Sequence, residues 1–163
     1  MPEQIDWVLY HTKASGTNAS AELTFFDDSE SNSGLQVTNM EVRGQLPSSQ
    51  RFTIDKIKVL LDVEAATGDV KDLLDSAVLE LNVNNRRMLI APLIEFCGGV
   101  NLNPETTAST TDDARTIGPE FELKKPLQIP GGVPFNVKIT IGKTAPSASS
   151  DITVMLKGIL ERP

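Results

Sequence analysis

The fold class follows from residues 121–141, which read Phe121-Glu-Leu-Lys-Lys-Pro-Leu-Gln-Ile-Pro-Gly-Gly-Val-Pro-Phe-Asn-Val-Lys-Ile-Thr-Ile141. From Phe135 onward, apolar and polar residues alternate, which is the period of a strand with one buried and one solvated face. The first half keeps the alternation, but Pro126 cannot donate to a neighbouring strand, so this half is expected at a sheet edge or a bend. Pro130-Gly131-Gly132 is expected to form a tight turn. The stretch predicts strand, turn, strand.

The same alternation recurs along the chain and brings the number of predicted strands to about eight. A one-residue slip near Asp55-Lys56 indicates a β-bulge or a break between two short strands. Asn84-Asn85 is expected to turn a hairpin, because asparagine tolerates left-handed backbone. Helical spacing appears only over residues 68–76, with Asp69 as the expected N-cap. The further strands are expected at 21–26, 36–44, 52–63, 78–83, 86–91 and 152–160.

Eight short strands separated by turn signals predict an all-β fold, and an eight-stranded antiparallel jelly-roll sandwich with one short helix fits best. The long polar connection over residues 103–119 favours a Greek key over a meander. An immunoglobulin-type sandwich is the next choice. We expect two parts: an N-terminal arm over residues 1–20 and a jelly-roll domain over residues 21–163.

Length, cysteine count and charge exclude several classes of protein. A chain of 163 residues suits one domain with a core of its own. Cys97 is the single cysteine, so no intramolecular disulfide can form. The net charge is −7 and the basic pairs are short, which argues against direct binding of nucleic acid. No stretch is apolar for long enough to cross a membrane, and the N-terminus lacks the pattern of a secretory signal.

Few residues offer catalytic chemistry. His11 is the only histidine and could activate the Cys97 thiol as a nucleophile, which would make the chain a hydrolase. Cysteine is more often a small core hydrophobe, and we expect this of Cys97. Paired carboxylates could also hydrolyse glycosides, but glutamate on the wet face of a strand needs no special explanation. The strand glutamates are Glu22, Glu41, Glu80 and Glu122.

An acidic loop over residues 27–34 resembles the start of a calcium loop, with Asp28, Glu30 and Asn32 at alternate positions. Its glycine comes one place late, and Asn39 stands where a bidentate glutamate is needed. Asp112-Asp113 could complete such a site in three dimensions. A solvated acidic loop is the simpler interpretation, and we expect no metal site and no cofactor.

Aromatic residues supply the candidate contact surface. Trp7 and Tyr10 are the only residues of their types and lie in the expected N-terminal arm. Phe25 and Phe26 are neighbours in a predicted strand, so their side chains should point to opposite faces. One of them is then expected under a loop, under the arm or in a subunit contact. All four are candidates for a subunit interface.

Several phrases occur in an order that resembles a known family. They are Leu23-Thr-Phe-Phe26, Thr38-Asn-Met40 with Gly44-Gln-Leu-Pro47, Arg51-Phe-Thr-Ile54, residues 81–92, residues 121–130 and Leu156-Lys-Gly-Ile-Leu160. Together they resemble the single jelly-roll major capsid proteins of tailless icosahedral bacteriophages, some of which enclose a membrane. The resemblance covers about residue 21 to the end and implies a β-sandwich upright in a shell, without catalytic residues.

The expected function is therefore a structural capsid subunit that self-assembles in a virion after synthesis in the host cytoplasm. Expected partners are other copies of the chain and a second capsid protein, with a viral membrane beneath the shell in some members of the family. No nucleic acid and no small-molecule substrate is expected. A carbohydrate- or ligand-binding β-sandwich module is the alternative, although such modules expose more aromatic residues than this chain offers.

Overall fold

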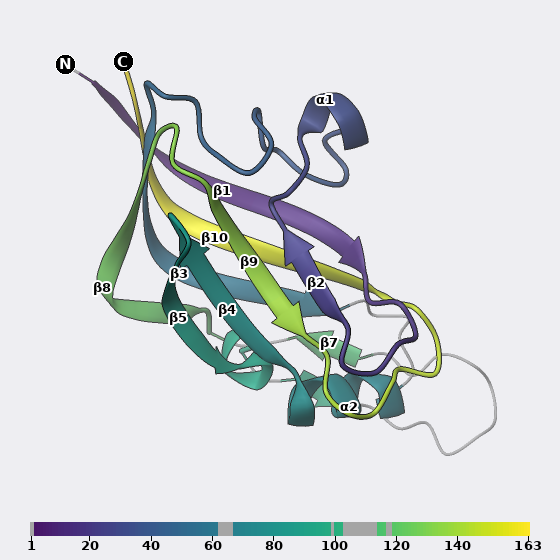
Figure 1. Ribbon diagram of the computed structural model, residues 1–163. Helices are drawn as coiled ribbons and strands as arrows, with labels where there is room; N and C mark the ends of the chain where they lie inside the picture. The colour runs from purple at the N-terminus through teal and green to yellow at the C-terminus, as the bar shows by residue number, and fades with distance from the viewer. Residues whose placement is uncertain (1, 62–66, 99, 103–113, 117–118) are drawn as a thin grey trace.

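The computed structural model describes residues 2–61, 67–98, 100–102, 114–116 and 119–163, which build two four-stranded antiparallel sheets packed face to face (Figure 1). The first sheet has the strand order β1-β10-β3-β8 and the second β2-β9-β4-β5. A further small sheet pairs β6 (Val100–Leu102) with β7 (Ala114–Thr116). The eight sandwich strands are β1 (Glu3–Ala14), β2 (Glu22–Phe25), β3 (Arg51–Leu61), β4 (Val78–Val83), β5 (Arg86–Pro92), β8 (Phe121–Pro130), β9 (Phe135–Thr140) and β10 (Asp151–Arg162).

This strand order is that of a jelly roll, in which two Greek keys wrap a pair of sheets. β1, β3, β8 and β10 belong to the first sheet, and β2, β4, β5 and β9 to the second, so most connections cross from one sheet to the other. The predicted all-β, eight-stranded antiparallel jelly roll is confirmed. In the described part of the chain, no helix is both long and apolar enough to span a membrane.

Alternation places the core between the sheets. In β3 the slip expected near Asp55 is a bulge within one strand, because Ile54 pairs with Gly158 and Lys56 with Lys157. The bulge lets apolar residues on both sides of it face the same core. A Cβ at Gly158 would overlap the Thr53 backbone there, which explains the glycine. The fully buried core side chains include Phe52, Ile54, Ile57, Val59, Leu79, Leu81, Val137, Ile139, Ile152, Val154 and Leu156.

The opening stretch forms β8, a turn and β9. β8 is an edge strand, as its proline predicts, and its pairing with β3 jumps from Leu127 to Glu122, so that the backbone around Pro126 leaves the ladder. Gly132 takes a φ of 71° in the turn, as expected. Gly131 lies so close to the segment before β3 that a Cβ would overlap the carbonyl oxygens of Pro47 and Gln50. The turn therefore carries the chain from the first sheet to the second.

The hairpin and the helix appear where the sequence predicts them. Asn84 and Asn85 have φ angles of 51° and 59° and connect β4 to β5. The helix α2 covers Thr67–Ser76, and the 3-10 turn η1 (Leu93–Phe96) follows β5. Asp69 is not the N-cap, because it lies inside α2 and its carboxylate accepts bonds from Ser147 and Ala148. It ties the helix to the loop before β10.

The strand expected over residues 36–44 is wrong. The short helix α1 (Glu30–Ser33) precedes this segment, which then runs as turns with isolated bridges, among them Thr38 opposite His11. Backbone groups here pair with β1 and with the neighbouring loops rather than with a regular partner strand. Apolar and polar residues alternate over residues 36–44 because one side of this segment contacts the sandwich. The segment nevertheless forms no regular strand. The connection expected over residues 103–119 lies mostly outside the described residues.

Residues 3–14 form a strand rather than the arm expected over residues 1–20. β1 pairs with β10 from Glu3 opposite Arg162 to Ala14 opposite Asp151, and it buries Leu9. Every second residue faces inward, but tryptophan and histidine among them disguise the alternation. The jelly roll therefore begins at β1 and not at residue 21, and removal of residues 1–12 would remove most of a sheet strand.

Candidate functional site

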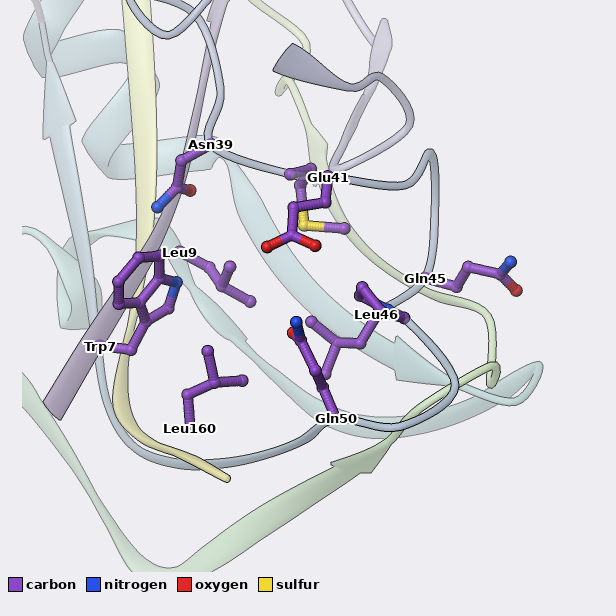
Figure 2. A pocket seen from close by; sticks show the side chains of 10 residues that line it. Trp7, Leu9, Asn39, Glu41, Gln45, Leu46, Gln50 and Leu160 are labelled. Carbon is purple, nitrogen blue, oxygen red and sulfur yellow. The ribbon is translucent and has the colours of Figure 1, made fainter. Parts of the chain in front are cut away.

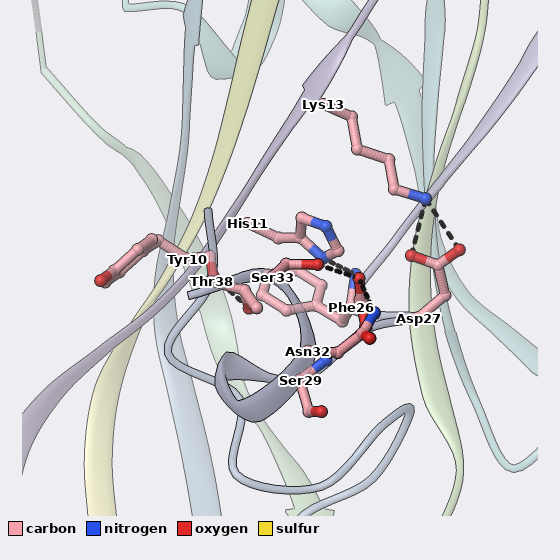
Figure 3. A network of polar contacts seen from close by, with 10 residues as sticks. Tyr10, His11, Lys13, Phe26, Asp27, Ser29, Asn32, Ser33 and Thr38 are labelled. Carbon is pink, nitrogen blue, oxygen red and sulfur yellow. Dashed lines mark hydrogen bonds and ion pairs between the residues drawn. The ribbon is translucent and has the colours of Figure 1, made fainter. Parts of the chain in front are cut away.

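His11 is a buried residue within a network of polar contacts that joins β1, the end of β2 and α1 (Figure 3). Its side chain is 1% exposed, and its Nδ1 accepts a 2.7 Å hydrogen bond from the backbone N–H of Phe26. The rings of Phe25 and Phe26 meet the imidazole edge-on, with centroids 5.9 and 6.0 Å away. Because Nδ1 accepts, the neutral ring carries its proton on Nε2. The histidine holds the strand end of β2 against β1.

Burial, more than the charges around it, keeps the His11 imidazole neutral. Burial and the nearby Lys13 ammonium lower the pKa of His11, and the carboxylates of Asp27 and Asp28 oppose them only in part. Lys13 Nζ lies 2.7 Å from both carboxylate oxygens of Asp27. The ion pair spans the gap between β1 and the end of β2 (Figure 3). The arrangement serves to fasten two strands.

Cys97 follows η1 in the core and is fully buried. Burial raises the pKa of its thiol to about 12, so at neutral pH it is a thiol and not a thiolate. Among the described contacts no hydrogen bond joins it to His11, whose Nδ1 is occupied by Phe26. The nucleophile pair suggested by the sequence is not assembled, and Cys97 packs as a small apolar residue.

The acidic loop is organised by its own hydrogen bonds. Asp28 accepts from the Ser29 N–H at 2.9 Å, from the Asn32 side chain at 2.9 and 3.1 Å, and from the Ser33 hydroxyl. These bonds lower the pKa of Asp28 to about 2. Within the described residues no three His, Cys, Asp or Glu side chains gather as a metal site would require. Asp112-Asp113, the other half of the calcium hypothesis, lie outside the described residues.

Most of the strand glutamates pair with bases on the outer faces of the sheets. Glu22 meets Lys138 at 2.7 Å, and Glu80 meets Arg87 at 3.0 Å, both on the second sheet. On the first sheet Glu122 lies 3.8 Å from Lys56. These are exposed ion pairs of small energetic value. They give no sign of the two facing carboxylates that glycoside hydrolysis uses.

Trp7 projects from β1 into a small hollow whose other side is the loop that leads to β3 (Figure 2). Its ring lies 5.2 Å from the Arg162 guanidinium, and it is half-buried. The hollow that it lines with Leu46 and Leu160 has a volume of about 10 Å³, room for about one water and not for a sugar. The contacts of the indole are therefore mainly with residues of the same chain.

The other aromatic candidates are also engaged within the chain. The Tyr10 hydroxyl donates to the Leu35 carbonyl, and the side chain is half-buried. Phe25 and Phe26 are both fully buried, so neither can serve the subunit interface suggested for them. A φ of 65° at Phe26 breaks the strand alternation and turns both rings into the core. That backbone turn was not visible in the sequence.

Three exposed large apolar residues lie elsewhere, on and after β5; the others in the described part of the chain are Val8, Leu35 and Ile159. Met88 and Ile90 are each 50% exposed, and Ile94 in η1 is 48% exposed. Sequence reasoning assigned this segment only to a hairpin. The available signal was the unbroken apolar run Met88-Leu-Ile-Ala91, which offers apolar groups to both faces of the strand. We therefore take this exposed apolar surface as the candidate functional site.

No protein-family model and no curated protein matches the chain. Its function has to be inferred from the fold, the chemistry of its residues and its surface.

Proposed function

We propose that the chain is a structural capsid subunit, which self-assembles into the icosahedral shell of a bacteriophage. The observation that carries this proposal is the jelly-roll strand order, β1-β10-β3-β8 against β2-β9-β4-β5. A fold by itself does not specify a function. The ordered phrases that resemble single jelly-roll capsid proteins supply the second support, and they run through the strands of both sheets.

The chemistry of the described residues is consistent with a scaffold. The reactive side chains that sequence analysis singled out are used structurally: His11 bonds to the Phe26 backbone, and the Cys97 thiol is buried. The enclosed hollow under Trp7 is too small for a ligand, and the larger hollows beside β3 and β8 are open and lined mostly by charged side chains. The described surface instead offers ion pairs, two sheet faces and a partly apolar edge. No observation specifically favours the carbohydrate-binding alternative.

The proposal includes the partners and the place of action. The chain would contact other copies of itself and a second capsid protein in the virion, after synthesis in the host cytoplasm. A net charge of −7 suits a shell that reaches its genome through another protein or a membrane rather than by direct contact with phosphates. It needs no cofactor and no small-molecule substrate.

Assembly is the direct test. The purified chain is concentrated, alone and with the product of a neighbouring small β-protein gene, and followed by light scattering and electron microscopy. We expect closed particles or regular capsomers. A chain that stays monomeric under both conditions and is absent from virus-like particles would refute the proposal. A glycan array run in parallel tests the alternative, for which specific sugar binding would be the positive result.

A further inference from the structure

The sandwich has four edge strands, and edges carry unpaired backbone groups that other chains can bind. In the first sheet they are β1 and β8, and in the second sheet β2 and β5. Proteins usually protect such edges by covering them, shortening them, or placing charges and proline on them. An edge without protection is therefore a candidate for pairing with another strand.

The second half of the β1 edge, from Val8 to Thr12, is covered by the segment that follows α1. The Asn39 side chain accepts from the Tyr10 N–H at 2.9 Å and donates to the Val8 carbonyl at 2.7 Å. The Thr12 N–H donates to the Val37 carbonyl at 2.8 Å. These bonds use the backbone groups that a partner strand would need. The second half of β1 is closed to pairing.

β8 and β2 are protected in other ways. β8 carries the exposed Lys124, Lys125 and Pro126, two charges and a residue without an N–H, where its backbone leaves the ladder. β2 is only four residues long, from Glu22 to Phe25. Both devices are typical of strands that must not recruit a partner.

β5 is different, because its centre is long enough and apolar enough to bind a strand. It has seven residues, and Met88 and Ile90 project exposed apolar side chains from it. Leu89 is packed against the core from the other side of the strand. The regular part of β5 is limited at one end by a bulge, which lies opposite Leu81-Asn82. At the other end it is limited by Pro92. In the part of the chain that the structure describes, the backbone of β5 pairs with β4 alone, so its outer edge is open over a short stretch centred near Ile90.

We propose that β5 pairs with β5 of a second copy, antiparallel about a two-fold axis at Ile90. This pairing would join the second sheets of two copies into one continuous eight-stranded sheet. Ile90 would face Ile90 of the second copy, and Met88 would face its Pro92, since residues of an antiparallel pair lie opposite on the same face. The inference deepens the proposed capsid function, on which it rests, by naming the surface through which copies meet.

Charge along the segment favours a second copy over an unrelated strand. Arg86 and Arg87 stand at its start, and Glu95 stands just beyond its end in η1, with Arg86 and Glu95 both exposed. Antiparallel pairing brings the basic start of one copy to the acidic end of the other, twice in each dimer. A parallel arrangement would bring arginine against arginine. The segment is thus self-complementary in charge as well as in its apolar centre.

Disulfide trapping tests the contact even if the free dimer is weak. Ile90→Cys places one thiol at the proposed axis, and Leu35→Cys places one at a 62% exposed position in another loop as the matched control. The native Cys97 is buried and stays silent. With oxidised glutathione as the oxidant, we expect covalent dimers of Ile90→Cys to form at least about tenfold faster than those of Leu35→Cys. Equal rates would overturn the proposal.

Charge reversal tests the register and the identity of the partner. Arg86→Glu and Glu95→Arg, each added to Ile90→Cys, should slow trapping when present alone, because they place like charges together. Mixing the two variants should restore fast trapping as heterodimers, since every reversed charge then meets its opposite. If mixing gives no recovery, the proposed antiparallel register is wrong.

The two proposals fail separately. If particles form but Ile90→Cys is trapped no faster than Leu35→Cys, the β5 contact is refuted and the capsid function is not. Selective trapping by a chain that never assembles would leave the contact and remove the capsid function.

Discussion

Replacement of His11 by phenylalanine isolates one buried hydrogen bond. The new ring would stay in the apolar surroundings of Phe25 and Phe26, but the Phe26 N–H, which now donates at 2.7 Å to Nδ1, would lose its acceptor. A buried N–H without a partner costs about 1–3 kcal/mol. We expect His11→Phe to lower the free energy of unfolding near neutral pH by about this amount. His11→Gln offers an amide oxygen and should recover part of the loss.

The same variant should change how stability depends on pH. Since the pKa of His11 is lowered in the folded protein from 6.5, the unfolded chain takes up the proton first as the pH falls. Stability is then fully present above the unfolded pKa and is lost as the pH drops through the folded one, at up to about 1.4 kcal/mol per pH unit. The carboxylates whose pKa values are lowered, such as Asp28, titrate in a more acidic range.

Urea unfolding followed by the fluorescence of Trp7, the only tryptophan, measures both effects. Wild type, His11→Phe and His11→Gln are compared at about pH 7.5 and about pH 5.5, a window that contains the ordinary pKa of histidine, at which the unfolded chain takes up its proton. The wild type should lose more stability on acidification than His11→Phe. An equal loss in both proteins would show that His11 titrates alike in the folded and unfolded states, and the argument from burial would fail.

Two further substitutions test backbone and loop packing by thermal unfolding. Gly131→Ala should destabilise the protein by about 1–3 kcal/mol, because its Cβ would overlap the carbonyl of Pro47. Its control Gly68→Ala, which meets no atom within 4 Å and lies in α2, should be neutral or slightly stabilising; similar losses for both would contradict the packing argument. Asp69→Ala should cost about 1–3 kcal/mol, because the N–H and hydroxyl of Ser147 lose their acceptor. An unchanged melting temperature would mean that the loop finds other partners.

Local periodicity predicted most of the elements correctly. The bulge at Asp55, the Asn84-Asn85 turn and the edge position of β8 could all be predicted, because each depends on a few neighbouring residues. β1 was missed as a strand because Trp7 and His11 occupy inward positions that usually hold aliphatic residues. Residues 36–44 alternate between apolar and polar side chains, which predicts a strand. The alternation is explained by contact with β1, and no regular ladder of hydrogen bonds forms.

The candidate contact surface was harder to predict. Trp7 and Tyr10 attract attention as rare aromatic residues, yet their contacts with Arg162 and Leu35 lie within the chain. Phe25 and Phe26 are both buried, because one left-handed residue overrides the strand alternation. The exposure of Ile90 depends on the position of β5 at the edge of the second sheet, and the amino-acid composition does not determine that position.

The sequence by itself determined the class of the fold, since a period of two in the side chains and the turn residues between strands act over only a few positions. It also determined that few groups could perform chemistry, because the chain has one histidine and one cysteine. Only the tertiary structure decided which sheet each strand joins, which edges are covered, and which apolar residues face outward. These depend on pairings between segments far apart in the sequence, such as Glu3 with Arg162 in the first sheet, which form only when the whole chain folds.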